Sequence, residues 1–202
     1  MNNEETNLVH LCPKYSGGCE HTPLTNDDLL KLTDQQGQLI YGPTFTIATI
    51  CEPMVFGPSV NGFKTSDDIH TSNGMIWSVV TSGKDAKVPE IRTPWQVDVR
   101  DVARTHIAAL EQMTDTNERY LIAAETWSHQ RAIDIIHEST TIPTSIKDTT
   151  PIGTKGQRLS DHFDIDSSKA QKELGITFIP FEKTVEDLSL QFAQLQEKLQ
   201  HH

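Results

Sequence analysis

Long apolar segments and a cysteine framework are both missing from this chain. No apolar run approaches the roughly 18 residues that a membrane-spanning helix needs. The first residues, Met1–Thr6, are polar and acidic, unlike a secretory signal. The three cysteines, at positions 12, 19 and 51, are too few and of odd number for a disulfide framework. These absences predict a cytoplasmic location, where thiols stay reduced.

Basic residues are also scarce. The chain has 17 Lys and Arg against 28 Asp and Glu, a net charge of −11. This balance disfavours a nucleic acid or an anionic membrane as partner. A phosphate-bearing cofactor is still allowed, because backbone amides can hold a phosphate locally.

Two short motifs near the N-terminus could suggest a metal. His10-x-Cys12 and Cys19-x-His21 contain residues that zinc accepts, but the usual Cys-x2-Cys spacing is absent. We therefore predict no metal site and interpret this segment as divergent, with two ordinary thiols; a zinc or redox module is kept as a weak alternative. Cys51 ends an apolar run and is expected to be a small buried hydrophobe.

The order of apolar patterns predicts an α/β protein. Strands are expected at 44–51, 95–99 and 119–123, with helices between and after them. A Pro-containing turn is expected directly after Cys51, and residues 57–66 and 139–161, which contain several Gly and Pro, are expected to form loops. Alternating strands and helices favour an α/β sheet over an all-β or all-α domain. The length of 202 residues suits one domain with a smaller appendage.

Three helices are expected from the spacing of apolar residues and from capping residues. A helix capped by Asp101 would place Ala103, Ile107 and Leu110 toward the core, and Asp98 and Arg100 would form an ion pair at the strand end. Ser128 is expected to cap a second helix. The last helix carries a stripe at spacings of three and four that favours packing on its own domain over a dimer helix: Val185, Leu188, Phe192, Leu195 and Leu199.

Five segments of the chain are informative together because of their order: Thr49–Pro58, Asn73–Gly83, Val97–Ala103, Asn117–Ile122 and Asp166–Gly175. In this order they resemble the NAD-dependent epimerase/dehydratase family. These are extended short-chain dehydrogenase/reductases (SDRs), and the likeness is to the group of fungal ketoreductases, dihydroflavonol 4-reductase and methylglyoxal reductase. The resemblance implies a partial Rossmann-like doubly wound sheet with a small C-terminal substrate-binding α/β lobe. Residues 1–43 would be a divergent segment and residues 44–202 the C-terminal part of such a protein.

Two motifs of that family are missing from the sequence. No Gly-x-x-Gly-x-x-Gly loop joins a strand to a helix, although this loop lets backbone amides approach the cofactor pyrophosphate. No Tyr-x-x-x-Lys is present either, since Tyr15, Tyr41 and Tyr120 each lack a lysine four residues later. In such reductases that tyrosine donates the proton to the carbonyl. We therefore assign no catalytic residue.

The resemblance nevertheless implies a site. Pro53, Met54 and Val55 would line the cofactor, which would be NADP or NAD. Met75, Trp77 and Trp95 are candidates for the substrate pocket, with core packing as the alternative for each aromatic residue. The family has a proline at the position of Glu52. A carboxylate there could point to solvent or lie near the cofactor face, and we favour solvent because an unpaired buried charge is costly.

Two functions follow from this combination. The first is an NAD(P)-dependent reductase of small aldehydes or ketones; the second is a non-catalytic remnant or binding module with the same fold. We expect the isolated chain to be inactive or nearly so, and its binding of the cofactor to be doubtful. The strand at 44–51 is expected to be poorly covered, with Phe45, Ile47, Ala48 and Ile50 available for self-association through the sheet edge.

Overall fold

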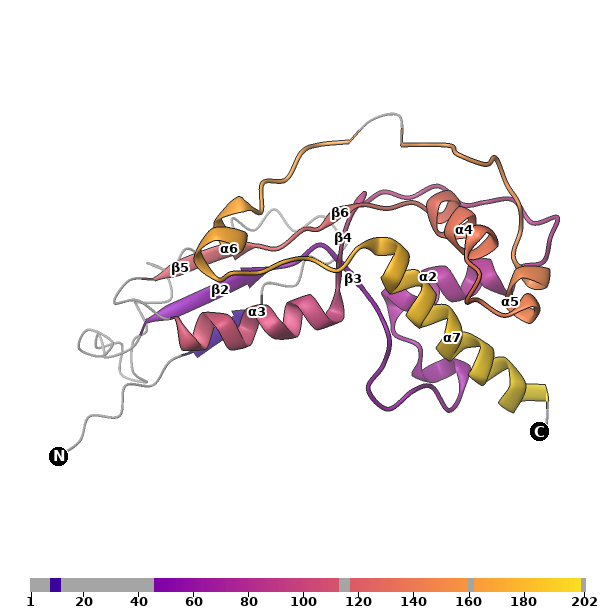
Figure 1. Cartoon of the computed structure of the whole chain (residues 1–202), viewed down its shortest axis with the longest axis horizontal. Coiled ribbons are helices and arrows are strands. Elements are labelled where there is room, and N and C mark those ends of the chain that lie inside the picture. The colour runs from indigo at the N-terminus through magenta and orange to yellow at the C-terminus, as the bar shows by residue number, and fades with distance from the viewer. Residues whose placement is uncertain (1–7, 12–45, 113–116, 160–161, 201–202) are drawn as a thin grey trace, which may run out of the picture.

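The computed structural model describes residues 8–11, 46–112, 117–159 and 162–200. The described part is α/β, with a parallel sheet at one end and a mostly helical lobe at the other (Figure 1). Two short strands, β3 and β4, lie where the two parts meet. The expected fold class is confirmed. The sequence expectations for 12–45, including those for the cysteines at 12 and 19 and for Phe45, lie outside the described residues.

The parallel sheet has the order β1-β2-β5, with β2 in the centre. Its strands are β1 (Leu8–Leu11), β2 (Ile47–Cys51) and β5 (Glu118–Leu121). The expectation that β2 is poorly covered is wrong, since Ile47, Ala48 and Ile50 are at most 3% exposed. Strands on both sides and a cluster shared with Ala109 and Tyr120 cover it.

A second small sheet has the order β3-β4-β6. Its strands are β3 (Met54–Phe56), β4 (Trp95–Asp98) and β6 (Glu125–Thr126). β3 runs parallel to β4, whereas β6 is antiparallel to it. The sequence patterns predicted β4 but read β3 as a turn and did not show β6, because strands of two or three residues are too short to display alternation.

The helical lobe packs around one aromatic cluster. Its elements are the 3-10 helix η1 (Ser66–Asp68), α2 (Thr71–Val80), α4 (His129–Glu138), α5 (Thr144–Thr149) and α7 (Phe181–Gln200). The ring of Phe56 lies 4.6 Å from that of Trp127 and 6.0 Å from that of Phe181. Ser128 caps α4 as expected, whereas α5 occupies a segment that was expected to be loop.

The stripe of α7 packs within this lobe, as predicted. Its first four members, Val185, Leu188, Phe192 and Leu195, are fully buried, and only Leu199 is exposed. The ring of Phe192 stacks 5.8 Å from Phe63. This apolar face therefore anchors α7 to its own chain.

Helix α3 (Val99–Glu111) departs from the sequence expectation in two ways. Its N-cap is Asp98, not Asp101, which lies buried in the first turn. The predicted core stripe is also wrong, because Ala103 is exposed and Ile107 is 57% exposed. Polar residues take the inward face because they have partners there: Thr105 Oγ1 donates to the Asp101 carbonyl oxygen at 2.7 Å.

Helix α6 (Ser168–Glu173) completes the cover of the parallel sheet. Its residue Ala170 joins the same cluster as β2, and the Lys169 ammonium lies 5.0 Å from the Tyr120 ring. The following segment runs back along α3, where Arg104 donates to the Thr177 carbonyl oxygen at 2.9 Å, and enters α7 (Figure 1).

Candidate functional site

The candidate site lies where β2 ends and β3 begins. Glu52 and Pro53 join these strands, and the carboxyl ends of β2 and β5 are adjacent because the strands are parallel, with Cys51 opposite Leu121. Open α/β sheets bind their ligands beyond the carboxyl ends of the strands. This edge is therefore the place to look for a ligand site.

Glu52 does not simply point to solvent. Its Oε2 atom is enclosed and has no hydrogen-bond partner in the described part of the chain. Burial raises the pKa of this carboxyl, and its own backbone N–H and the nearby His106 only partly oppose that rise. His106 lies on α3, with Nδ1 2.7 Å from the Val102 carbonyl oxygen. The solvent-facing interpretation of Glu52 is therefore wrong for one of its two oxygens.

Gln96 is a second polar side chain without a partner at this place. It is fully buried, and neither its Oε1 nor its Nε2 is hydrogen-bonded. It lies between Met54 and Glu125 in register, so the three side chains share one face of the small sheet. Glu125 does not satisfy it: its carboxylate accepts from Phe181 N at 2.7 Å and from Arg131 at 2.6 Å, and Gln96 has no hydrogen bond to it. Sequence reasoning missed Gln96; the only signal was a polar residue inside an apolar strand.

The three residues expected to line a cofactor follow directly. Pro53, Met54 and Val55 are all half-buried, and Met54 packs against the aromatic cluster of the lobe. They lie beside the two unsatisfied side chains described above. An enclosed polar atom without a partner is costly, so a polar group of a ligand that reached this place would be favoured.

The three residues expected to line a substrate pocket are divided between two places. Trp77 lies on α2 with its ring 5.0 Å from Phe192, and Met75 packs against the same cluster. Trp95, at the start of β4, donates its indole N–H to the Phe163 carbonyl oxygen at 2.6 Å. Trp77 therefore packs against the lobe core, whereas Trp95 fixes the segment that leads toward α6.

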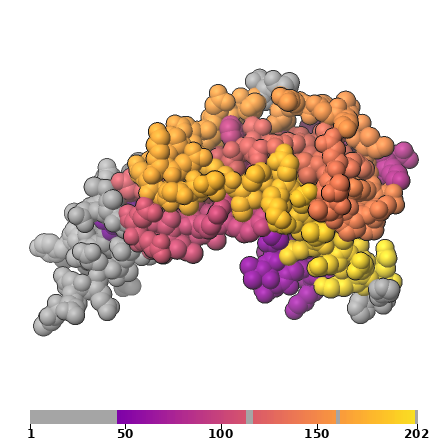
Figure 2. Space-filling model, viewed as in Figure 1, coloured from indigo at the N-terminus to yellow at the C-terminus, as the bar shows by residue number. Residues whose placement is uncertain are grey.

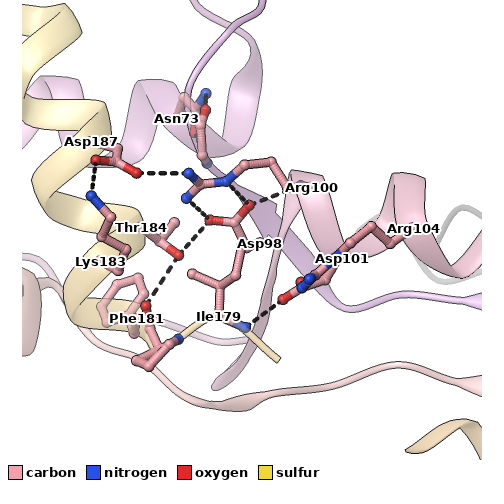
Figure 3. Close-up of polar contacts among 12 residues, drawn as sticks. Asn73, Asp98, Arg100, Asp101, Arg104, Ile179, Phe181, Lys183, Thr184 and Asp187 are labelled. Atoms are coloured by element: carbon pink, nitrogen blue, oxygen red, sulfur yellow. Dashed lines mark hydrogen bonds and ion pairs between the residues drawn. The ribbon is translucent and has the colours of Figure 1, made fainter. Parts of the chain in front are cut away.

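A network of charges joins α3 to α7 (Figure 3). The Asp98 carboxylate is fully buried, accepts from Thr184 Oγ1 at 2.6 Å and pairs with Arg100 at 2.8 Å. Arg100 also pairs with Asp187 at 2.7 Å, which in turn pairs with Lys183 at 2.7 Å. The predicted Asp98–Arg100 ion pair is confirmed, and its partners show that it fastens one helix to another.

Asp101 continues this network on the other side of the helix start. Its Oδ2 accepts from Ile179 N at 2.8 Å, and its Oδ1 accepts from Arg104 (Figure 3). The sequence suggested only a cap for this residue. Because every carboxylate of the Asp98 and Asp101 pair has protein partners, the network is structural.

Gly57 is required where β3 turns toward the lobe. Its φ is +137°, and a Cβ there would lie 2.9 Å from Val99 Cγ1. The Asn73 side chain holds this turn from α2, accepting from Gly57 N at 3.2 Å and donating to its carbonyl oxygen at 2.8 Å. The close packing at Gly57 and its hydrogen bonds to Asn73 thus explain the Phe-Gly-Pro sequence that ends the segment Thr49–Pro58.

The lobe also contains a cavity of about 390 Å³ away from this edge. Its charged residues are largely paired with one another, for example Lys84 with Asp148 at 3.1 Å and Lys155 with Glu138 at 2.9 Å. It is lined by Lys84, Asp134, His137, Glu138, Lys147, Asp148, Thr150, Ile152 and Lys155. Within the described ranges no group of three or more His, Cys, Asp or Glu could hold a metal, and no helix is long and apolar enough to cross a membrane.

Comparison with known proteins shows which proteins this chain resembles in sequence. No family model matches the chain. It is 30% identical over 148 residues to a putative NADPH-dependent methylglyoxal reductase of Candida albicans, covering 72% of this chain and 42% of the relative. It is 33% identical to the ketoreductase azaE of Aspergillus niger, over 67% of this chain and 40% of that protein. A further relative is the NADPH-dependent methylglyoxal reductase GRE2 of Saccharomyces cerevisiae, 23% identical over 77% of this chain and 45% of that protein.

Solved structures agree with the fold. The crystal structure of Gre2 from Candida albicans in complex with NADPH matches with a TM-score of 0.65 and 27% identity, covering 83% of this chain and 47% of that chain. A UDP-glucose 4-epimerase matches with a TM-score of 0.52 and 15% identity, which shows the fold alone. The chain spans less than half the length of the relatives it matches.

Proposed function

We propose that residues 44–202 form the C-terminal part of an NADPH-dependent reductase that acts on small aldehydes or ketones. The observation that carries this proposal is the match to the NADPH complex of Gre2 over 83% of the chain. The relatives include NADPH-dependent methylglyoxal reductases, and this supports a small carbonyl compound as the substrate. A cytoplasmic location belongs to the same proposal.

The described residues fit one end of such a cofactor. The half-buried Pro53–Val55 segment at the carboxyl end of β2 would hold the nicotinamide end, beside the unsatisfied Glu52 and Gln96. The cofactor would supply a hydride for the carbonyl carbon. Nothing in the sequence matches the glycine-rich loop that would hold the pyrophosphate. Binding of the whole cofactor therefore needs residues that this sequence does not offer.

The residues proposed for the substrate have different roles in the structure. Trp95 stands at the start of β4, next to Gln96, and is the best placed of the three for a substrate near Pro53–Val55. Met75 and Trp77 would shape the pocket through the packing of α2 against the lobe. Each of these three side chains packs against other residues in the structure. They would therefore shape the pocket and would take no part in the chemical step.

Activity of the isolated chain is proposed to be absent or very low. General-acid assistance is typically worth about 10²–10⁴-fold, and no Tyr-x-x-x-Lys supplies it here. Loss of cofactor positioning reduces the rate further. The same absence supports the second function, a non-catalytic module that keeps the fold. Self-association is also proposed, although β2 cannot supply the contact because Ile47 is buried.

The test is NADPH consumption by the purified chain with methylglyoxal, isovaleraldehyde and a panel of ketones, with Gre2 from Candida albicans as the positive control. We expect no turnover above background, and only weak quenching of NADPH fluorescence. A turnover of about one per second would contradict the proposed inactivity and require another proton donor. Absence of both turnover and NADPH binding would favour the non-catalytic module.

A further inference from the structure

The outer face of α3 is apolar and uncovered. Val99 is 37% exposed, Ile107 57% and Leu110 48%, and Ala103 is also exposed. Spacings of four, four and three residues place them on one stripe of the helix, about 17 Å long at 1.5 Å per residue. Figure 2 shows the surface of this segment at the outside of the molecule. A stripe of this kind normally faces a protein partner.

Two opposite charges flank the stripe on the same side. The Arg104 side chain is 52% exposed, and only its Nη2 is engaged, by Asp101 and the Thr177 carbonyl oxygen. Glu111, seven residues later, is exposed and has no hydrogen bond or ion pair with the described residues. It ends α3, where the helix dipole disfavours a negative charge. A cation from outside would stabilise it there.

We propose that a second copy of this chain covers this face, with the two α3 helices antiparallel and related by a two-fold axis at Ile107. The spacing then places Ile107 against the partner's Ile107 and Leu110 beside the partner's Ala103, so a large side chain meets a small one. Arg104 comes within one residue step of the partner's Glu111. By symmetry each apolar contact off the axis and each ion pair occurs twice.

The size of the stripe sets the strength of this association. With the axis at Ile107, Val99 lies beyond the end of the partner's α3, so the apolar contact is made by Ala103, Ile107 and Leu110. Three side chains on each helix bury less than the roughly 1,200 Å² of a standard interface, so a weak dimer is expected. A dissociation constant in the range of about 10–500 µM is the expected outcome. Because the contact is made by α3, it does not depend on the reductase function.

Sedimentation velocity from about 5 to about 500 µM tests the proposal, and wild type should shift from monomer to dimer across that range. Ile107→Lys should weaken the association at least about 10-fold, because it places two ammonium groups together on the axis. Glu111→Lys should weaken it about 3- to 10-fold by losing both ion pairs. Leu199→Lys is the matched control: Leu199 on α7 is also 48% exposed and should leave the dimer unchanged.

Disulfide trapping tests the geometry. Ile107→Cys should cross-link under mild oxidation far faster than Leu110→Cys, because only position 107 faces its own copy; wild type reports the background from the three native cysteines. A chain that stays monomeric to 500 µM, or a dimer that Ile107→Lys does not weaken, overturns the proposal. Equal trapping at positions 107 and 110 overturns the antiparallel arrangement. All the substituted side chains are exposed, and thermal melts check that each variant is folded.

Discussion

Gln96 is a carboxamide in a position that suits an apolar side chain. It is fully buried in β4, and its Oε1 and Nε2 have no partner among the described residues. A buried polar group left unsatisfied costs about 1–3 kcal/mol. The Gln96→Leu variant should therefore be more stable than wild type by about 1 kcal/mol in urea unfolding.

Gln130 provides the control for that prediction. It is 4% exposed, and its carboxamide donates to Asp134 at 2.8 Å and accepts from Thr154 N at 2.9 Å. The same change at this position, Gln130→Leu, should destabilise the fold by about 1–3 kcal/mol because it leaves these partners unsatisfied. If Gln96→Leu is as destabilising as Gln130→Leu, a buried water must be serving Gln96.

Glu52 predicts a dependence of stability on pH. Its pKa is raised in the folded state, so ionisation is harder there than in the unfolded chain. The wild type therefore carries a penalty above the raised pKa, which disappears as the pH falls below the ordinary value of 4.5. Glu52→Gln should raise the melting temperature at pH 8 by roughly a few degrees and leave it unchanged at pH 4. The exposed Glu111→Gln serves as control, and a difference between wild type and Glu52→Gln that does not change with pH contradicts the enclosed carboxyl.

At the scale of elements, the joint between α3 and α7 depends on Asp98. This carboxylate caps α3, pairs with Arg100 and accepts from Thr184 of α7. Asp98→Ala should lower the free energy of unfolding by about 3 kcal/mol, because a cap and several charge-assisted hydrogen bonds are lost together. Lys84→Ala, which breaks an exposed pair with Asp148, should change it by less than about 1 kcal/mol. Equal effects in urea unfolding would contradict the role of Asp98 in holding the helices together.

The sequence predicted long elements better than short ones. The stripe of α7 and the cap of α4 follow from spacings within one helix, and both were predicted. Strands β3 and β6 and the six-residue α5 have too few residues for a period to show. For α3 the period was visible but its inward face was assigned wrongly, because the burial of Asp101 and Thr105 depends on partners elsewhere in the chain.

At the scale of the whole molecule, the chain resembles Gre2 in fold, but its sequence lacks two motifs of the family. The match to that structure covers 83% of this chain but only 47% of that chain. The printed sequence contains neither a Gly-x-x-Gly-x-x-Gly loop nor a Tyr-x-x-x-Lys. The experiments on low activity and on the dimer therefore both use the full 202-residue chain.

The sequence by itself determined the α/β class, the order of the matching segments, the Asp98–Arg100 pair and the placing of Pro53–Val55 beside the end of a strand. These depend on residue type and short spacing, which can be read along the chain. Only the tertiary structure decided that Ile47 is covered, that Glu52 has an enclosed oxygen, that Gln96 lacks a partner and that Ile107 faces outward. Each of these depends on which distant segment lies against the side chain, and a local pattern does not contain that information.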